Sequence, residues 1–335
     1  MNKVRFAVIG CGRIGERHAK HITELGILKA VCDIDPGKAN DLATKYNATP
    51  YADIDELLAR ERDIDVVSIC TPNGLHANHS IKSLKAKRNV LCEKPMAISV
   101  YDCGEMIKTA ERMNKRLFVI KQNRFNPPVV AVKHALDEKK LGNIFSIQLT
   151  CFWNRNEEYY KNNWKGTKEL DGGTLYTQFS HFIDLLHWFT GDIDTVEGYK
   201  NTYRNRSQFE LEDTGVAILK MKSGAIGTLN YTINSVSKNL EGSLSLFAEK
   251  GNVKIGGQYL NTLEWFDVEG ESKPIISQSD LANDYGYYQG SMSNHHKVYD
   301  DLVQSIEGNG NLLEAKDAIA TVEMIEKIYA ATKKE

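Results

Sequence analysis

A glycine-rich turn near the N-terminus is the first group of residues whose spacing could bind a ligand. Gly10, Gly12 and Gly15 form the pattern G-x-G-x-x-G, between the apolar run 4–9 and the amphipathic segment 14–25. These two segments have the patterns of a buried strand and a helix. Glycines permit a tight turn and a close approach to a diphosphate, while the helix N-terminus supplies partial positive charge. The spacing therefore predicts a dinucleotide-binding loop, formed by Gly10, Gly12, Arg13, Ile14 and Gly15.

Asp33 is the acid expected to accompany this loop. It lies 18 residues after Gly15, at the end of the strand-like run 28–32. A carboxylate there accepts hydrogen bonds from the adenosine ribose and repels the 2′-phosphate of NADP. No Arg or Lys directly follows it, so we expect NAD as the cofactor. The alternative is a glycine turn that only joins a strand to a helix.

Two side chains have the chemistry for proton transfer. Lys94, in Glu93-Lys94-Pro95, follows the predicted strand 89–92 and should lie at the carboxyl edge of a parallel sheet, where ligands bind. His181 precedes Asp184 by three residues, so the two can share one face of a helix. A histidine oriented by a carboxylate suits a general base. The alternatives are a solvated lysine and a histidine with a purely structural role.

The elements that must position these residues follow from the hydrophobic pattern. Up to residue 120, strand-like runs alternate with helical segments, which predicts a doubly wound parallel sheet. After Asn126-Pro127-Pro128 come a helix at 129–139 and alternating strands, interrupted by a helix at 174–189 and closed by one at 315–332. We expect an α/β protein in which residues 1–122 form an NAD-binding Rossmann domain. Residues 123–335 should form an α+β domain for substrate binding and oligomerisation, with a large, mostly antiparallel open sheet.

Composition narrows the class of protein. The 335 residues carry 42 Lys and Arg against 44 Asp and Glu, so the net charge of −2 gives no reason to bind nucleic acid or an anionic membrane. The six cysteines lack a C-x-x-C pair and are expected to be reduced core residues. We expect a cytoplasmic enzyme. We expect no metal site at His295-His296, because neither a carboxylate nor a cysteine stands at ligand spacing beside this pair.

The order and spacing of three motifs resemble the Gfo/Idh/MocA oxidoreductases over nearly the whole chain. The motifs are the glycine loop, Glu93-Lys94-Pro95 and Gly172-Gly173 followed by His181-x-x-Asp184. The resemblance implies that Lys94 and His181 are the catalytic residues and flank the carbon that gives hydride to the nicotinamide. Many members carry an Asp four residues before the histidine, whereas this chain has Thr177. The resemblance therefore leaves the catalysis to Lys94 and His181.

Three further segments, 121–127, 164–167 and 177–182, resemble the sugar-nucleotide 3-dehydrogenases of the WlbA and WbpB type. This resemblance implies oxidation of the C3′ hydroxyl of UDP-N-acetyl-2-amino-2-deoxy-D-glucuronate, on a route to diamino uronic acids of surface polysaccharide. It also implies 2-oxoglutarate as the oxidant that recycles bound NADH in some such enzymes. The expected NAD contacts further include Thr71, Pro72, Asn73, His76, Glu93, Lys94 and Gln122. The expected substrate contacts are Lys94, Asn123, Arg124, Arg155, Trp164, Lys165, Thr177, Gln178 and His181.

The segment 154–168 interleaves four cations with aromatic residues. Cations can bind phosphate and aromatic rings can stack on uracil or sugar, although a solvated loop is an equal alternative. A second aromatic loop, 285–296, is expected to close over the nucleotide. The other functions that fit are an NAD-dependent dehydrogenase of UDP-N-acetylglucosamine or inositol, and a non-catalytic NAD(H) sensor. We expect a homodimer or homotetramer, because an uncovered apolar sheet face favours association.

Overall fold

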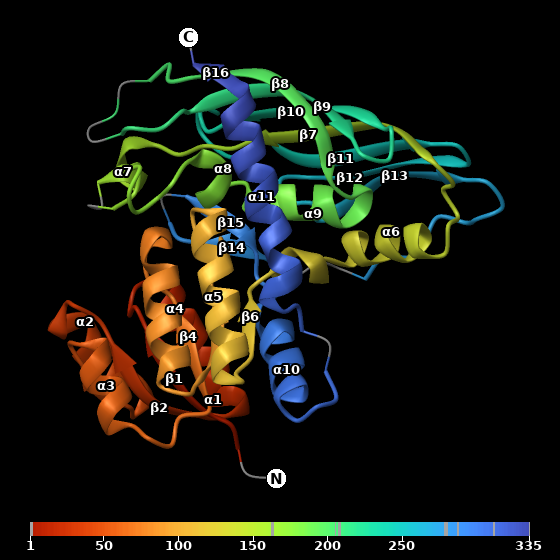
Figure 1. The fold of residues 1–335 in the computed structure, drawn as a ribbon. Helices are drawn as coiled ribbons and strands as arrows, with labels where there is room; N and C mark the ends of the chain where they lie inside the picture. The colour runs from red at the N-terminus through yellow and green to blue at the C-terminus, as the bar shows by residue number, and fades with distance from the viewer. Residues whose placement is uncertain are drawn as a thin grey trace. The chain divides into compact units, whose positions relative to one another are not determined.

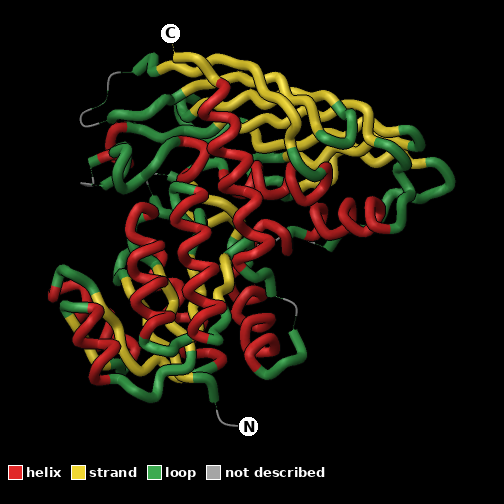
Figure 2. The backbone as a smooth tube through the Cα atoms, in the orientation of Figure 1, coloured by secondary structure: helices red, strands yellow, loops and turns green. Residues whose placement is uncertain are grey.

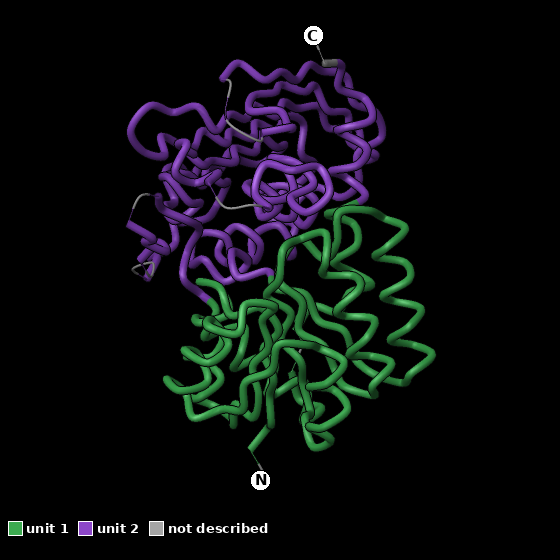
Figure 3. The backbone as a smooth tube through the Cα atoms, turned by 90° about the vertical axis from the view of Figure 1, so that its left-hand side faces the viewer, with its two compact units in different colours: residues 1–120, 295–322 green, residues 121–294, 323–335 purple. Residues whose placement is uncertain are grey.

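The chain folds into two compact units in the computed structural model (Figure 3), which describes residues 3–161, 164–204, 206, 209–277, 281–286, 288–310 and 312–334. Unit 1 contains residues 1–120 and 295–322, and unit 2 contains residues 121–294 and 323–335. The predicted second domain ran from 123 to 335 without interruption. The structure therefore differs from the prediction in assigning residues 295–322 to unit 1.

Unit 1 is built on a parallel sheet of six strands, in the order β3-β2-β1-β4-β5-β6. The strands are β1 (Arg5–Ile9), β2 (Ile27–Cys32), β3 (Thr49–Tyr51), β4 (Val66–Ile69), β5 (Asn89–Cys92) and β6 (Leu117–Val119). The predicted doubly wound parallel sheet is confirmed. The order reverses between β1 and β4, and ligands of such sheets bind at the carboxyl ends of the strands beside this switch point.

Helices connect these strands, and several begin at capping residues that the sequence suggests. The helical elements are α1 (Arg13–Leu25), α2 (Pro36–Tyr46), α3 (Ile54–Arg60), η1 (Asn73–Leu75), α4 (His76–Lys85) and α5 (Val100–Met113), followed later in the chain by α10 (His295–Ile306) and α11 (Ala315–Ala331). The Asp35 side chain accepts hydrogen bonds from the backbone N–H groups of Gly37 and Lys38, and Ser99 accepts one from that of Asp102. These side chains satisfy N–H groups that a helix leaves unpaired at its start.

A buried tyrosine explains why α10 belongs to unit 1. Tyr299 packs edge-on against Phe6 of β1, with ring centroids 5.8 Å apart. Its hydroxyl lies 2.8 Å from His18 Nδ1 and 2.9 Å from Ser68 Oγ. Packing of this kind links residues nearly three hundred positions apart in the sequence, so the local pattern around residue 299 contains no sign of it.

Unit 2 contains a mixed sheet of eight strands in the order β13-β12-β11-β7-β10-β9-β8-β16. The strands are β7 (Ile144–Phe152), β8 (Ile193–Asn201), β9 (Thr214–Met221), β10 (Ile226–Thr232), β11 (Glu241–Ala248), β12 (Gly251–Gly256), β13 (Thr262–Val268) and β16 (Thr332–Lys334), and a separate pair is formed by β14 (Ala282–Asp284) and β15 (Gln289–Met292). The pairs β7–β10 and β8–β16 are parallel, and the others in this sheet are antiparallel. The expected large, mostly antiparallel sheet is confirmed, although it is not a simple meander.

The helices of unit 2 lie on one face of this sheet, as Figures 1 and 2 show for α6 and α9. The helical elements are η2 (Gln122–Phe125), α6 (Pro127–Asp137), α7 (Glu157–Tyr160), α8 (Thr174–Thr177) and α9 (Ser180–Thr190). The predicted single helix 174–189 is interrupted between α8 and α9. Along β9, Ala217 and Leu219 are buried whereas Val216 and Ile218 are exposed, so the opposite face of the sheet is open and partly apolar. No helix in the described part of the chain is both long and apolar enough to span a membrane.

A buried glutamate connects three elements of unit 2. Oε1 of Glu212 accepts hydrogen bonds from the Tyr329 hydroxyl of α11, at 2.6 Å, and from the Thr174 N–H at the start of α8, at 3.1 Å. The Tyr329 hydroxyl also accepts the Leu175 N–H at 2.8 Å. Burial raises the pKa of Glu212 to about 7, because an ionised carboxylate loses its hydration there. This carboxyl group therefore positions the segment that leads into α8 and α9.

We predict a pH-dependent contribution of Glu212 to stability. A folded-state pKa above the unfolded value makes the protonated form the favoured one, so the contribution is fully present at acid pH and is lost as pH rises through about 7. Glu212→Gln mimics the protonated form. The free energy of unfolding of the wild type minus that of the variant should fall by roughly 2–3 kcal/mol between pH 5 and pH 8.5. Urea unfolding at both pH values measures this difference.

The exposed Glu269→Gln provides the control and should show no such change, since its side chain lies in a surface turn. A Glu212→Gln difference that is the same at pH 5 and pH 8.5 would contradict the prediction.

Candidate active site

The glycine loop has the geometry of a dinucleotide cradle. Gly10 has φ +98°, and a Cβ there would lie 2.6 Å from the Cys70 carbonyl oxygen. A Cβ on Gly15 would lie 1.9 Å from the Gly10 carbonyl oxygen, so α1 can pack this closely against the turn after β1 only with glycine at position 15. A Cβ on Gly12 would meet no atom within 4 Å. Because the protein itself does not require a glycine at position 12, the open space there fits an approaching diphosphate.

Asp33 lies beside this loop at the end of β2. Its Oδ2 accepts the Cys11 N–H at 2.8 Å and its Oδ1 accepts the Asp35 N–H at 2.9 Å. Two backbone amides thus fix a half-exposed carboxylate next to the turn that follows β1. Together with exposed Gly12 and Arg13 at the N-terminus of α1, this carboxylate fits the ribose and diphosphate of NAD.

The His76 side chain contacts the turn after β4 and the turn after β5. Its Nδ1 lies 2.7 Å from the Pro95 carbonyl oxygen, and its Nε2 lies 2.9 Å from the Thr71 carbonyl oxygen. Burial lowers the pKa of His76. Each ring nitrogen faces a backbone carbonyl oxygen, to which a neutral imidazole can donate from one nitrogen, so the structure gives His76 a supporting role for the turn that carries Lys94. The predicted contacts of Thr71, Pro72, Asn73 and His76 with NAD stay predictions.

Glu93 precedes Lys94 and is almost fully buried, with 5% of its surface exposed. Its Oε2 accepts the Lys94 N–H at 3.0 Å, and its Oε1 lies 2.9 Å from His18 Nε2 and 3.2 Å from His295 Nε2. Burial alone would raise its pKa, but the two histidines bring the pKa well below its usual value. The sequence has no carboxylate or cysteine at ligand spacing beside His295-His296, but in the structure Glu93, which is distant in sequence, lies within hydrogen-bonding distance of His295. The prediction that this pair binds no metal stays a prediction.

In unit 2, the predicted catalytic histidine lies in the first turn of α9. His181 is buried, and so is Asp184 one turn later. The Asp184 carboxylate is held by Arg124 through two contacts of 2.8 Å and by Lys121 at 3.0 Å. Burial would raise the pKa of Asp184, but these two cations bring it well below its usual value. Arg124, expected to bind substrate, thus has an ion-pair partner that spacing did not reveal.

The carboxylate of Asp171 lies beside Thr177, at whose position many family members carry an aspartate. The Thr177 hydroxyl donates a hydrogen bond to Asp171 Oδ1, and the Gly166 N–H donates to Oδ2 at 2.9 Å. Burial raises the pKa of Asp171 to about 6. The sequence analysis missed this residue, although its place directly before Gly172-Gly173 was a signal that could have been used.

Two neighbouring amides in η2 lack the hydrogen bonds that buried polar groups normally make. In the described part of the chain, neither side-chain polar atom of Asn123 has a partner, and the same holds for Oε1 of Gln122. The Gln122 Nε2 donates to Ser291 Oγ at 3.1 Å. Leaving such groups unsatisfied costs about 1–3 kcal/mol each. The two residues therefore have hydrogen-bonding capacity for a ligand, as predicted for a cofactor contact of Gln122 and a substrate contact of Asn123.

Arg155 is buried in a cage of aromatic rings. Its guanidinium carbon lies 4.8 Å from the ring centroid of Trp153, 5.2 Å from that of Tyr159 and 5.0 Å from that of Tyr288. Nε donates to Gln178 Oε1 at 2.6 Å, and Nη1 donates to the Asn154 carbonyl oxygen at 2.6 Å and to Asn239 Oδ1 at 3.2 Å. All of these acceptors are neutral. The guanidinium charge is thus buried, with 2% of the residue exposed, without a carboxylate at hydrogen-bonding distance among the described residues.

Lys165 is a second cation beside the aromatic rings that surround Arg155. Its Nζ lies 3.8 Å from the ring centroid of Tyr159 and 5.8 Å from that of Trp164. Gln178 contacts both Arg155 and Tyr159, since its Oε1 accepts from Arg155 Nε and its Nε2 donates to the Tyr159 hydroxyl at 2.8 Å. The structure therefore brings together Arg155, Trp164, Lys165 and Gln178, which the sequence analysis predicted as substrate contacts. Residues 162, 163 and 287 of the two predicted loops lie outside the described residues.

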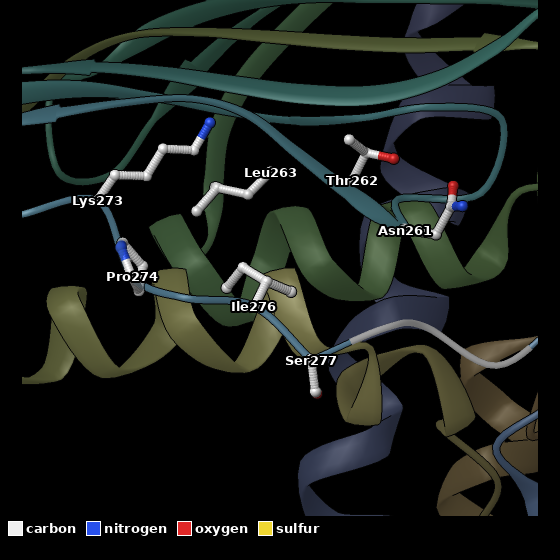
Figure 4. Close-up of a pocket in the computed structure, with 7 residues that line it drawn as sticks. All are labelled: Asn261, Thr262, Leu263, Lys273, Pro274, Ile276 and Ser277. Atoms are coloured by element: carbon white, nitrogen blue, oxygen red, sulfur yellow. The ribbon is translucent and has the colours of Figure 1, made fainter.

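Figure 4 shows a hollow beside β13, in a part of unit 2 that is distant in sequence from Arg155 and Lys165. It is lined by Asn261, Thr262, Leu263, Lys273, Pro274, Ile276 and Ser277. None of them was predicted as a site residue, and the set contains no histidine, cysteine or carboxylate. The hollow therefore offers no chemistry for proton transfer.

We predict that Gly12→Ala weakens NAD binding without unfolding the protein. The added methyl group meets no protein atom but occupies the space that the diphosphate needs. The dissociation constant for NAD should rise about tenfold or more, while the melting temperature without NAD stays near that of the wild type. Isothermal titration calorimetry and thermal melts measure the two quantities. Gly104→Ala, also unobstructed, is the control and should retain wild-type affinity. Equal affinity in both variants would contradict the cradle.

Comparisons with known proteins agree with this geometry. Residues 4–121 match a model of the oxidoreductase family with an NAD-binding Rossmann fold, and residues 129–254 match the GFO/IDH/MocA C-terminal domain. The chain is similar to the WlbA dehydrogenase from Bordetella pertussis, solved in complex with NADH and UDP-GlcNAcA. That similarity has a TM-score of 0.88 and 32% identity, covering 98% of this chain and 96% of the other.

Two curated relatives show a range of substrates. The 2,7-anhydro-N-acetylneuraminate hydratase of Escherichia coli is 26% identical over 87% of this chain and 77% of its own length. The inositol 2-dehydrogenase of Salmonella typhimurium is 29% identical over 58% of this chain and 57% of its own length. The family matches, the parallel sheet and the glycine cradle lead to one conclusion: the chain belongs to the Gfo/Idh/MocA family of NAD-binding oxidoreductases.

Proposed function

We propose that this protein oxidises the C3′ hydroxyl of a UDP-sugar uronate, UDP-N-acetyl-2-amino-2-deoxy-D-glucuronate, to the 3-keto sugar with NAD⁺. The observation that carries the proposal is the buried Arg155, whose hydrogen-bond acceptors among the described residues are all neutral. An uncompensated buried charge is costly, and an anionic ligand removes that cost. A UDP-uronate brings a diphosphate and a carboxylate, and its flat uracil ring suits stacking on the aromatic side chains around Arg155.

Similarity supports the same substrate class. The Bordetella pertussis enzyme, whose complex contains UDP-GlcNAcA, is 32% identical over nearly the full length of both chains. The product would serve the synthesis of diamino uronic acids for surface polysaccharide, with 2-oxoglutarate as the oxidant that regenerates bound NAD⁺. The second candidate is a free polyol, favoured by the inositol 2-dehydrogenase relative. A polyol has no charge to pair with Arg155, so we rank it lower.

The catalytic roles are assigned to Lys94 and His181. When bound, NAD⁺ accepts the hydride that leaves C3′. His181 takes the hydroxyl proton, and Lys94 donates a hydrogen bond to the same oxygen and orients it. The C3′ alcohol is thereby oxidised to a ketone, and the proton passes from His181 to solvent. General-base assistance of this kind is worth roughly 10²- to 10⁴-fold in rate.

A substrate panel tests the function. NADH formation is followed with UDP-N-acetyl-2-amino-2-deoxy-D-glucuronate, UDP-N-acetylglucosamine and myo-inositol, each with and without 2-oxoglutarate. We expect turnover on the uronate and loss of most turnover in Lys94→Ala and His181→Asn. Oxidation of inositol alone would overturn the proposal.

Arg155→Gln separates an anionic substrate from a neutral one. Loss of a charged hydrogen-bonding group of this kind corresponds to about 10- to 150-fold in binding, so KM for the uronate should rise by that factor. KM for NAD⁺ should stay near the wild-type value. Arg60→Gln, at a side chain with 69% exposure in unit 1, is the matched control. An unchanged KM for the uronate in Arg155→Gln would remove the observation on which the proposal rests.

We also infer that the open face of the eight-stranded sheet is where copies of this chain associate as a dimer or tetramer. Ile218, Ile226 and Trp265 point outward from β9, β10 and β13 with 63%, 60% and 58% of their surfaces exposed. Neighbouring outward positions are polar, such as Thr228 opposite Ile218 and Lys254 opposite Trp265. Apolar side chains in a polar surround are typical of protein interfaces.

Ile218→Glu should shift the protein to a smaller species, because a buried unpaired carboxylate opposes association. Analytical ultracentrifugation at micromolar concentration measures the mass. Ile275→Glu, at a fully exposed residue outside the sheet, is the control and should leave the mass unchanged. A wild-type protein that sediments as a monomer would show that this face does not mediate association.

A further inference from the structure

The Glu93 cluster, defined as His18, Ser68, Glu93, His295 and Tyr299, is a buried hydrogen-bond network next to Lys94. Its members come from α1, β4, the turn after β5 and α10, and all belong to unit 1. Every member has at most 5% of its surface exposed. The cluster therefore connects the helix that follows the glycine loop to the backbone of a proposed catalytic residue.

The hydrogen bonds determine which atoms carry protons. His18 Nε2 and His295 Nε2 both face the same carboxylate oxygen, so each nitrogen must carry its hydrogen. His18 Nδ1 can then accept the hydrogen of the Tyr299 hydroxyl, whose oxygen accepts that of Ser68. His295 Nδ1 is buried without a hydrogen-bond partner in the described part of the chain, which matches a neutral imidazole. Two imidazole N–H groups thus donate to one carboxylate oxygen.

The Glu93 carboxylate consequently has both oxygens in use. Oε1 accepts two imidazole N–H groups, and Oε2 accepts the N–H of Lys94. The sequence analysis expected Glu93 to bind NAD near the nicotinamide ribose. A carboxylate offers about four acceptor positions, so the three N–H donors use most of the hydrogen-bonding capacity of Glu93 inside the protein.

We propose that Glu93 is a positioning residue, held by His18 and His295, that sets the backbone of Lys94. The proposal relies on the catalytic role of Lys94 given under the proposed function. The remaining titratable groups around Glu93 are Cys70, His76, Cys92, Lys94 and Tyr299, with Arg17 near His295. Burial raises the pKa of both thiols and of Tyr299, so these three stay neutral near pH 7.

A pair of substitutions at His295 tests the donor. His295→Gln keeps an N–H group close to the position of Nε2, whereas His295→Leu removes it. We expect kcat to fall about tenfold or more in His295→Leu and to be largely rescued in His295→Gln, with the dissociation constant for NAD near the wild-type value in both. Any substrate of the panel that yields NADH serves for kcat. Equal kcat in His295→Leu and the wild type would overturn the proposal.

Glu93→Gln tests the ribose alternative without any sugar substrate. A positioning residue predicts near-wild-type NAD affinity, measured by calorimetry, together with reduced kcat. A tenfold or larger loss of NAD affinity with unchanged kcat at saturating NAD would make Glu93 a cofactor ligand and overturn the proposal. Because this binding measurement needs no UDP-sugar, failure of the proposed function leaves it interpretable.

Measurements on the wild type keep the proposal testable if the variants do not fold. ¹⁵N-histidine NMR at pH 7 should show Nε2–H groups on both His18 and His295, with and without NAD. Loss of these signals on adding NAD would indicate that Glu93 leaves the histidines for the ribose. The His18, Glu93 and His295 ligand atoms also lie within 4.8 Å of one another. Activity abolished by a chelator and restored by Zn²⁺ would therefore assign them to a metal and overturn the proposal.

Discussion

The cost of burying an ionised group is the constraint on which the functional parts of this protein depend. Glu93 satisfies it with three N–H donors, and Asp184 satisfies it with Lys121 and Arg124. Arg155 is equally buried, but its acceptors in the part of the chain that the structure describes are neutral. Protein groups alone satisfy the carboxylates of Glu93 and Asp184, whereas the guanidinium of Arg155 has no anionic partner among the described residues. This contrast separates groups that support the site from a group that is suited to bind substrate.

The same constraint distinguishes two cations that the family resemblance treats alike. Arg124 and Arg155 are both cations in segments that resemble sugar-nucleotide dehydrogenases, and sequence gives no reason to treat them differently. In the structure, Arg124 lies in a two-contact ion pair and stacks 4.6 Å from the ring of Trp188. Arg155 instead lies among three aromatic rings. Arg124 therefore has an anionic partner inside the protein, whereas Arg155 is the cation that we propose to bind the anionic substrate.

Thr177 illustrates how a missing residue can be compensated from elsewhere in the chain. The Thr177 hydroxyl donates a hydrogen bond to the carboxylate of Asp171. A carboxyl group therefore lies next to position 177, although this chain lacks the aspartate that many family members carry there. Burial brings the pKa of Asp171 to about 6, which is close to the range in which enzymes exchange protons. The loop that precedes α8 supplies this group, and Glu212 with Tyr329 holds the start of that helix in place.

The sequence by itself determined the parallel sheet of unit 1, the glycine loop with Asp33, and the family. These features depend on local periodicity and on residues close together in the chain, where strand, turn and helix follow each other directly. Lys94 and His181 stand in short motifs, so the sequence also indicates them as candidates for catalysis.

Only the tertiary structure decided the assignment of residues 295–322 to unit 1, the parallel pairing of β7 with β10, and the partners of Glu93, Asp184 and Arg155. Each depends on side chains or strands that lie far apart in the sequence and meet through packing. Hydrophobic patterning states that a residue is buried, but not against what. For a charged side chain, the identity of the neighbour decides whether it stabilises the fold or binds a ligand.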